Sequence, residues 1–461
     1  MAGWPLRVTY QSGRKLLAAV IVVSACSGAC KVFENKISSS TTLRPTPFQG
    51  DRVVVYRGLN IPGGRENSGN VFAFRSSRPV LTGLDQLRQI DFELLKNRSF
   101  ALLTNNSGRD RELSDILQLL LNRGLPPALV LEPEHGLFGN HDDHLKAGVR
   151  VDRKTGLRFL SLYSANKKKP SSKDLKGIDL MVVDIQTLPV RCYTYISTLY
   201  YILGAAEKSE IEVMILDRTN PYGIWDARGQ FPEKRLRSFV SLVDIPFLYS
   251  MTPGEYGLYA ATTQFKRLRL SVIPVLNFRR RVYADNLSLP WINPSPNIPS
   301  PESSLVYAGM VFLEGINLNL GRGTTRPFIY TGAPWLDEKK VLEELVKLNL
   351  PGVQLGTVVF TPTSSKYAGR VCRGIQFHPL TSSFDPIRTA YEYMRVIKRL
   401  HPQRFEFSHG KKGYFLDRLW GSNWFRLSVV RNLPWDSFHR PWRTVGIEFE
   451  KQVAPYRLYG E

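Results

Sequence analysis

Two hydrophobic patterns alternate along the chain from about residue 80 to residue 248. Short runs that are apolar at every position are separated by longer segments in which apolar residues recur every three or four positions. The first pattern is typical of strands buried on both faces, and the second of helices that pack on a sheet. The runs predict strands at 99–104, 128–131, 178–185 and 211–216, with helices at 112–123 and 193–208. Strands and helices in this order favour a parallel sheet with crossover helices.

The pattern changes near Tyr249, where we place the boundary between two domains. Beyond it we expect a strand at 267–276, a proline-rich loop at 290–301, a loop rich in Gly and Asn at 314–325, and helices at 337–348 and 386–400. The sequence therefore predicts an α/β N-terminal domain at residues 80–248 and a smaller α+β C-terminal domain at residues 249–461.

The first thirty residues have the pattern of a secretory signal. Three basic residues, Arg7, Arg14 and Lys15, precede a short apolar segment at 16–23. Such a segment is too short to span a membrane but suits an export signal. It ends in Val23-Ser24-Ala25-Cys26, which looks like a bacterial lipobox.

We therefore expect residues 1–25 to be a signal peptide of the lipoprotein type and Cys26 to carry the lipid. Lipidation at Cys30 and ordinary cleavage after Ala29 are the alternatives. Residues 26–79 then form a polar tether and an N-terminal extension. The protein is expected to be exported to the bacterial cell envelope, with the lipid as its link to the membrane on the periplasmic face.

The chain has 461 residues and a formal net charge of +22. This charge suits an anionic partner, but it is explained as well by steering of acidic substrates or by solubility. The basic residues are spread along the chain, and their densest run, Lys167, Lys168 and Lys169, is expected to be a solvated loop. Because no helix-turn-helix, zinc-finger or RNA-binding signature is present, we predict no nucleic-acid partner.

Apolar runs and cysteines narrow the class of protein further. No run approaches the ~20 apolar residues of a spanning helix, which excludes a polytopic membrane protein. Four cysteines in 461 residues exclude a disulfide scaffold. Outside the signal region, Cys192 and Cys372 are expected to form either one disulfide or two buried thiols.

Polar residues follow all four of the predicted parallel strands. In open parallel sheets, ligands bind outside the carboxyl ends of the strands. Any one of these residues is explained as a turn or cap residue, but together they predict a site at this edge of the sheet. The set comprises Asn105, Asn106, Glu132, Glu134, His135, Asp184, Gln186, Asp217, Arg218 and Asn220.

Several longer motifs follow in order, and together they are highly specific. They include Pro133-Glu134-His135-Gly136, the run YTYIST at 193–198, Asn293-Pro294-Ser295-Pro296-Asn297, Leu313-Glu314-Gly315 and the run GRGTTRPF at 321–328. From about residue 79 to the C-terminus, the chain resembles the NamZ-type exo-β-N-acetylmuramidases. The resemblance implies a Rossmann-like N-terminal domain, a smaller C-terminal domain and an active site between them. It also implies release of β-linked N-acetylmuramic acid from the non-reducing end of peptidoglycan fragments.

The resemblance assigns catalysis to Glu134 of the PEHG motif. A Rossmann-like sheet does not by itself imply a dinucleotide, and no GxGxxG opens the first helix, so we predict no cofactor. His135, His141 and His144 lie close to Asp142 and Asp143, but their spacing matches no standard zinc motif, so we predict no metal.

The sequence departs from the family pattern at two carboxylate positions. Thr187 stands where the family usually has Asp, and Leu320 where it usually has Glu. These departures support an alternative function, a non-catalytic muropeptide-binding lipoprotein with the same pocket. Retention of Glu134 favours the enzyme.

Glycoside cleavage needs a proton donor for the leaving oxygen and a group that stabilises the positively charged sugar. Glu134 is the predicted acid, and His135 is expected either to orient it or to be structural. The second group stays open between Asp184, Asp217, Glu314 and the substrate's own acetamido group; Asp184 joins Glu134 and His135 in the predicted catalytic set.

The lactyl carboxylate of muramic acid calls for a cation, and a guanidinium binds a carboxylate through two hydrogen bonds. Arg322 and Arg326 are the first candidates, followed by Arg191 and Arg218. Tyr193 and Tyr195 are expected either to pack against a sugar face or to serve packing alone. The remaining predicted substrate-binding residues are Asn105, Asn220, Asn297, Asp217, Glu314 and Thr324.

Overall fold

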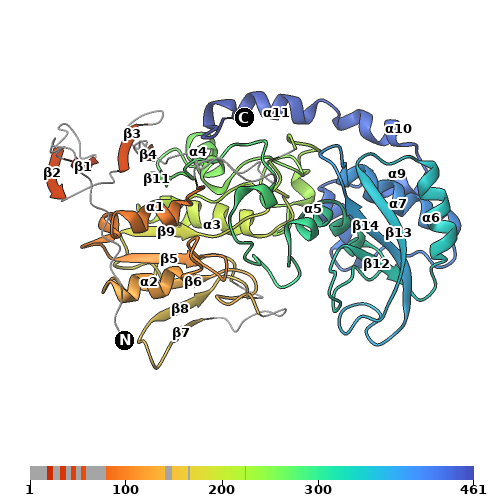
Figure 1. Ribbon diagram of the computed structural model, residues 1–461, viewed down its shortest axis with the longest axis horizontal. Coiled ribbons are helices and arrows are strands. Elements are labelled where there is room, and N and C mark those ends of the chain that lie inside the picture. Colours follow the sequence, from red (N-terminus) through yellow and green to blue (C-terminus); the bar gives the residue numbers. More distant parts are fainter. Residues whose placement is uncertain are drawn as a thin grey trace, which may run out of the picture.

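The computed structural model describes residues 18–23, 32–37, 43–47, 53–58, 79–140, 148–164, 167–223 and 225–460. These residues form two units, and a helical C-terminal segment runs back from the second to the first (Figure 1). Cys26, Cys30 and the histidines and aspartates at 141–144 lie outside the described residues.

A nine-stranded sheet forms the first unit, in the order β3-β4-β11-β10-β9-β5-β6-β8-β7. The seven strands from β4 to β8 in this order are parallel, and the edge strands β3 and β7 are antiparallel to their neighbours. The predicted parallel sheet is thus confirmed. The strands are β3 (Leu43–Pro47), β4 (Val53–Gly58), β5 (Phe100–Thr104), β6 (Leu129–Glu132), β7 (Val149–Val151), β8 (Arg158–Ser161), β9 (Leu180–Asp184), β10 (Glu212–Leu216) and β11 (Leu270–Ile273), with β1 (Ala18–Val23) and β2 (Val32–Ile37) as a separate pair.

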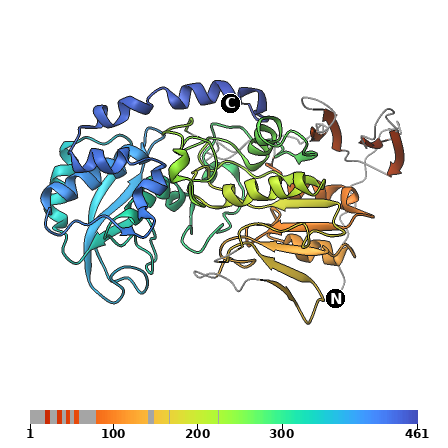
Figure 2. The ribbon, with the colours of Figure 1, turned by 180° about the vertical axis from the view of Figure 1, so that it is seen from behind.

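Helices cover both faces of this sheet, which explains the uninterrupted apolar runs. Phe100 and Leu102 of β5 pack on the side of α1 (Gly83–Gln89) and α2 (Ile116–Asn122). Ala101 and Leu103 of the same strand pack on the opposite side, in the core that includes α3 and α4. Figure 2 shows α3 (Tyr195–Lys208) in front of the sheet, and α4 is Pro253–Thr263.

The strand order reverses next to β5. From β5 the chain moves outward through β6 to β8 on one side, and then returns to build β9, β10 and β11 on the other side. Such a reversal opens a crevice at the carboxyl ends of the strands, where ligands bind in open α/β sheets. Glu134, two residues beyond β6, lies at this edge.

The first unit extends beyond the boundary that the sequence suggested. Both α4 and β11 follow Tyr249, and β11 pairs in parallel with β10, so this boundary falls inside the first unit. On the N-terminal side, β4 belongs to the sheet although the sequence predicted an extension there.

The second unit is an antiparallel three-stranded sheet packed with helices, as the α+β prediction requires. Its strands lie in the order β12-β14-β13. The elements are α5 (Pro301–Met310), β12 (Tyr330–Ala333), α6 (Glu338–Lys347), β13 (Val353–Phe360), β14 (Cys372–Pro379), α7 (Pro386–Leu400), β15 (His409–Gly410), β16 (Gly413–Tyr414), α8 (Phe415–Trp420), α9 (Trp424–Val430), α10 (Trp435–His439) and α11 (Val445–Val453). Short 3₁₀ helices occur along the whole described chain and not only in this unit. They are η1 (Glu93–Leu95), η2 (Lys234–Leu236), η3 (Ala284–Leu287), η4 (Val311–Gly315), η5 (Arg440–Trp442) and η6 (Ala454–Tyr456).

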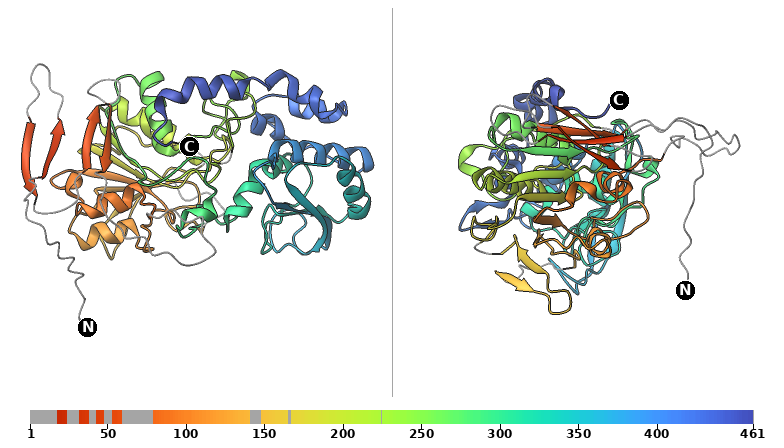
Figure 3. Two further views of the ribbon diagram at one scale, coloured as in Figure 1. Left: turned by 45° about the horizontal axis from the view of Figure 1, so that its top comes forward. Right: turned by 90° about the vertical axis from the view of Figure 1, so that its left-hand side faces the viewer.

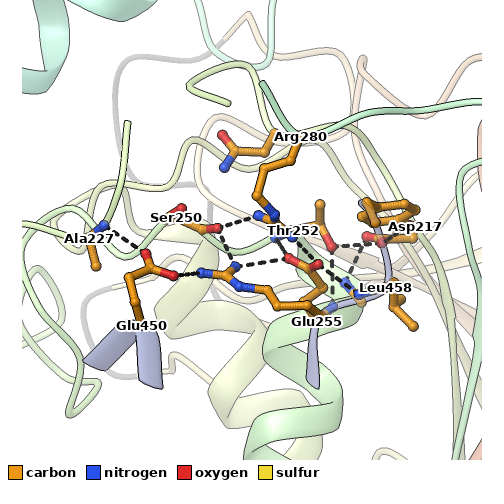
Figure 4. A network of polar contacts seen from close by, with 12 residues as sticks. Asp217, Ala227, Ser250, Thr252, Glu255, Arg280, Glu450 and Leu458 are labelled. Carbon is orange, nitrogen blue, oxygen red and sulfur yellow. Dashed lines mark hydrogen bonds and ion pairs between the residues drawn. The ribbon is translucent and has the colours of Figure 1, made fainter. Parts of the chain in front are cut away.

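The C-terminal segment, which we define as residues 445–460, ties the two units together. It leaves the second unit as α11 and lies along the first unit near α4 (Figures 1 and 3). Arg457 reaches Glu255 at 3.2 Å, and Glu255 also pairs with Arg280 (Figure 4). The Tyr459 hydroxyl donates to Asp217 at 2.5 Å. Buried charges are tolerated here because each has a partner.

None of the helices within the described ranges combines the length and the apolar character that crossing a bilayer requires.

Candidate active site

A cavity of about 420 Å³ brings together groups from both units. This volume is in the range of small-molecule sites. The sequence-predicted residues in its lining are Glu134, His135, Tyr193, Tyr195, Asn297, Glu314 and Arg322. Tyr163, Thr194 and Tyr307 also line it, and the sequence did not single them out.

Hydroxyl groups from two neighbouring segments surround the Glu134 carboxylate. The Thr194 hydroxyl, at the start of α3, donates to Glu134 Oε2. Tyr163 follows β8, the parallel neighbour of β6, so it lies at the same sheet edge as Glu134. Burial raises the pKa of Tyr163, and the charge and hydrogen bond of Glu134 raise it further. Tyr163 is therefore a neutral donor at neutral pH.

The turn after β6 directs Glu134 into the cavity. His135 has φ of 71° and Gly136 has φ of 74°, so two successive residues adopt the left-handed conformation. A non-glycine residue in this region stores strain of roughly 1–3 kcal/mol, and such strain clusters at functional sites. The Tyr195 hydroxyl lies 3.2 Å from the Glu134 carbonyl oxygen, and this contact helps to fix the backbone of the turn.

Glu314 is the second carboxylate of the cavity, and it comes from η4 of the second unit. Arg322 Nη2 donates to Glu314 Oε1 at 2.7 Å, and the two side chains are 29% and 24% exposed. Arg322 therefore lies where the sequence predicted a substrate-binding arginine, but it already has a carboxylate partner. Lys366 Nζ donates to the Glu314 carbonyl oxygen at 3.2 Å, which fixes the backbone of this turn.

The two predicted tyrosines have different surroundings. Tyr195 is 1% exposed, and its hydroxyl donates to the Pro294 carbonyl oxygen at 2.7 Å. Asn105 Nδ2 donates to the same hydroxyl at 2.9 Å and to the Pro294 oxygen at 3.0 Å. Tyr193 packs edge-on against Tyr195 at 4.8 Å between ring centroids. Tyr195 and Asn105 thus position the loop around Pro294, and Tyr193 lines the cavity.

Asp184 does not line the cavity, and its predicted catalytic role needs correction. Arg218 Nε and Nη2 donate to its two oxygens at 2.6 and 2.7 Å, and Asp184 is fully buried. Burial raises the pKa of Asp184 to about 6, although Arg218 opposes the shift. A carboxylate with both oxygens occupied inside the sheet edge is a structural ion pair.

Asp217 also serves structure. It is fully buried, and it accepts from Thr252 Oγ1 at 2.7 Å and from the Gly254 amide at 2.7 Å, at the start of α4. Burial raises the pKa of Asp217 to about 7 against these hydrogen bonds. Its oxygens point to α4 and Tyr459 and not to substrate.

Five more predicted binding residues lie outside the cavity lining. Arg218 pairs with Asp184, as described. Arg191 is fully buried and donates to the Gln230 and Ile245 carbonyl oxygens at 2.6 and 2.9 Å. The others are Arg326, exposed and 3.1 Å from Glu302; Thr324, which donates to the Gly321 oxygen at 2.6 Å; and Asn220, which accepts from the Tyr222 amide at 2.7 Å.

Lys168 also differs from its sequence prediction. Instead of lying in a solvated loop, it is half-buried, with Nζ 3.5 Å from the Tyr163 ring centroid and 4.9 Å from that of Phe239. Sequence reasoning missed Tyr163 and Lys168 because β8 was not predicted. Thr194 could have been found, since it lies between two residues of the YTYIST motif that were selected.

The two departures from the family pattern do not reach the cavity. Thr187 and Leu320 are each 2% exposed, and neither belongs to the cavity lining. Leu320 is part of the large apolar core. Substitution at these positions therefore leaves Glu134 and Glu314 facing the same space.

Cys192 also lines the cavity. Cys192 and Cys372 are free and buried, which decides between the two possibilities left open by the sequence. Among the residues described, no three His, Cys, Asp or Glu side chains are grouped so that they could hold a metal ion.

Comparison with known proteins covers both units. The chain matches the family models "Exo-beta-N-acetylmuramidase NamZ, N-terminal" over residues 100–302 and "Exo-beta-N-acetylmuramidase NamZ, C-terminal" over residues 305–459. It is 34% identical over 382 residues to the peptidoglycan beta-N-acetylmuramidase NamZ of Bacillus subtilis, a match that covers 82% of this chain and 91% of the relative.

Two solved structures have the same arrangement. Both are DUF1343 family proteins of Bacteroides fragilis. The first has a TM-score of 0.76 and 29% identity, and covers 82% of this chain and 99% of its own. The second has a TM-score of 0.65 and 26% identity, and covers 83% of this chain and 100% of its own. With both family models matched in order along its two units, the chain belongs to the exo-β-N-acetylmuramidase NamZ family.

Proposed function

We propose that this protein is a glycosidase that releases N-acetylmuramic acid from the non-reducing end of peptidoglycan fragments during cell-wall turnover and recycling. Membership of the family supports the reaction class. The observation that carries the proposal is the pair of carboxylates, Glu134 from the first unit and Glu314 from the second, in one cavity.

The two carboxylates differ in their partners, which suits two different roles. Glu134 has hydroxyl partners, and we assign to it transfer of a proton to the leaving glycosidic oxygen. Glu314 is paired with the Arg322 guanidinium, which favours a charged carboxylate next to the positively charged sugar of the transition state. Asp184 and Asp217, the other two carboxylates considered for the second group, have their oxygens occupied inside the first unit.

The binding-only alternative loses its main support. It rested on Thr187 and Leu320, and both are buried outside the cavity lining. An intact pair of carboxylates argues for turnover.

Replacing Glu134 by Gln tests the proposal. The change keeps the shape of the side chain and removes its proton, so turnover of a chromogenic β-N-acetylmuramide should fall by roughly 10²–10⁴-fold. Binding of N-acetylmuramic acid, measured by calorimetry, should persist. Glu302→Gln, outside the cavity and paired with Arg326, is the control and should keep normal turnover.

Two results would contradict these assignments. A wild-type protein that binds the muramide without cleaving it would support the binding-only function. A Glu134→Gln variant with most of the wild-type rate would remove Glu134 from the reaction. Glu314→Gln should also lower turnover, and a normal rate would reopen the choice of the second group.

We also propose that the protein is an exported lipoprotein of the bacterial cell envelope, with lipid on Cys26. The lipobox-like sequence before Cys26 supports this placement. Cys26→Ala should move the protein from the membrane fraction to the soluble fraction, whereas Cys30→Ala should not. Mass spectrometry of the native N-terminus checks it, and an unmodified start at another residue would contradict it.

A further inference from the structure

The cavity needs a cation for the lactyl carboxylate, and the predicted arginines do not provide a free one. Arg322 is 2.7 Å from Glu314, whose negative charge opposes a second carboxylate nearby. Arg326 is exposed and pairs with Glu302 outside the cavity. Arg191 and Arg218 are buried in contacts that hold the first unit together.

Lys168 is a different kind of cation. Its ammonium lies 3.5 Å from the centroid of Tyr163, a ring that lines the cavity, and 4.9 Å from that of Phe239. The two rings are themselves 5.9 Å apart. Phe239 precedes Val240, which also lines the cavity. The aromatic clamp, Tyr163 and Phe239, thus holds the ammonium against a ring of the cavity wall, and Lys168 itself is not part of the lining.

The neighbouring lysines show what is particular to Lys168. Lys167 has a carboxylate partner, Asp174, at 2.8 Å, and Lys169 is exposed, 5.7 Å from the Tyr201 ring centroid. Within the described part of the chain, the contacts of the Lys168 ammonium are aromatic faces, and no carboxylate lies within ion-pair distance of it. A cation held by aromatic faces is well placed to accept an anionic ligand, because the faces hold it without neutralising its charge.

Burial supports this interpretation. Partial removal from water lowers the pKa of Lys168, while the charge of Glu134 opposes the shift. A partly desolvated ammonium gains more from an incoming carboxylate than an exposed one does. Glu134 is the charged group that acts on this ammonium in the protein.

We propose that Lys168, held by the aromatic clamp, binds the lactyl carboxylate of N-acetylmuramic acid and sets the preference for muramides over glucosaminides. This inference rests on the proposed function. Under this proposal, Lys168 distinguishes N-acetylmuramic acid from N-acetylglucosamine, which differ only by the lactyl ether.

The test is a comparison of kcat/KM for 4-nitrophenyl β-N-acetylmuramide and the matching glucosaminide. Lys168→Met should lower kcat/KM for the muramide about 10- to 100-fold, the value of one charge-assisted hydrogen bond, and leave the glucosaminide unchanged. Lys168→Arg should restore most of the preference because it restores the charge. Lys169→Met is the matched control and should behave as wild type.

A modified substrate gives an independent measurement. The methyl ester of the lactyl carboxylate removes the charge from the sugar instead of from the protein. Wild type should lose its preference on this ester, and Lys168→Met should lose nothing more. An unchanged sugar preference in Lys168→Met, or an equal loss on both sugars as expected if Lys168 acted only through Glu134, would overturn the inference.

Calorimetry separates this inference from the proposed function. If wild type cleaves neither sugar, the proposed function fails, but binding can still be compared. Lys168→Met should then weaken binding of free N-acetylmuramic acid and not of N-acetylglucosamine. Equal binding of N-acetylmuramic acid by wild type and by a folded Lys168→Met or Lys168→Gln variant would again overturn the inference.

Discussion

At the scale of single residues, the Glu134 carboxylate depends on hydroxyl donors that the chain brings from separate segments. Thr194 supplies one of them from the start of α3. Thr194→Val keeps the shape of the side chain and removes this donor. Because a hydrogen bond to a charged group contributes about 1.5–3 kcal/mol, we expect kcat to fall by about 10- to 100-fold with little change in melting temperature.

The control for this prediction lies one helical turn further on. Thr198 is more deeply buried than Thr194, and its hydroxyl donates to the Thr194 carbonyl oxygen at 3.2 Å. Thr198→Val should retain normal kcat, and Thr194→Ser should recover most of the activity. Equal losses in the two valine variants, measured on the chromogenic muramide, would show that helix packing and not the hydroxyl is responsible.

The residues of the site differ in how far the sequence could reveal them. Glu134 and Arg322 lie in motifs at loops, Glu314 lies in a motif at η4, and all three reach the cavity. The surroundings of Lys168 depend on the Phe239 ring, which is distant in sequence, so local pattern indicated only a charged loop. Likewise, the sequence places Asp184 at a strand end but does not show that Arg218 takes both of its oxygens.

At the scale of elements, the carboxyl ends of the parallel strands divide between binding and support. The end of β6 delivers Glu134 to the cavity, whereas the end of β10 delivers Asp217 to the start of α4. The strand positions could be predicted because each strand is a short apolar run between polar turns. Which strand end contributes to the cavity and which supports the fold could not be predicted, since this depends on which loop from another element covers each strand end.

Because Asp217 titrates differently in the folded and unfolded chain, the stability of the protein should depend on pH. Its pKa is raised to about 7 by burial, whereas an aspartate in an unfolded chain titrates near 3.9. Between these values the folded state binds more protons than the unfolded state, so the free energy of unfolding should fall as pH rises from about 4 to about 7. The full effect is of the order of 4 kcal/mol, at about 1.4 kcal/mol for each unit of pKa shift.

The comparison with Asp217→Asn isolates this effect, because other titrating groups, including Asp184, are common to both proteins. Asparagine carries no proton that titrates here, so its free energy of unfolding should depend less steeply on pH in this range. Urea unfolding at several pH values measures the difference. Parallel curves for wild type and the variant would show that Asp217 ionises alike in the folded and unfolded chain.

At the scale of the whole molecule, the active site depends on the relative placement of two units, and the C-terminal segment fixes that placement. The cavity takes Glu134 from one unit and Glu314 from the other. The segment leaves the second unit and ends on the first (Figure 1). There Arg457 and Tyr459 reach Glu255 and Asp217, two residues that Figure 4 labels. This return could not be foreseen from the sequence, since its partners are about 200 residues away.

Glu255 is the centre of this contact, and removing its charge should cost more than removing one of its partners. It is fully buried and pairs with both Arg280 and Arg457. Glu255→Gln leaves the buried Arg280 guanidinium without its carboxylate, whereas Arg457 keeps Glu450, so the free energy of unfolding should fall by about 3–5 kcal/mol. Arg457→Met should cost less, because Glu255 keeps Arg280 and the Leu458 amide at 2.9 Å.

Glu448→Gln on the exposed side of α11 is the control and should be neutral. Urea unfolding of the three variants ranks them, and an Arg457→Met variant less stable than Glu255→Gln would mean that the segment is held mainly by the packing of the Arg457 side chain and not by the buried charge.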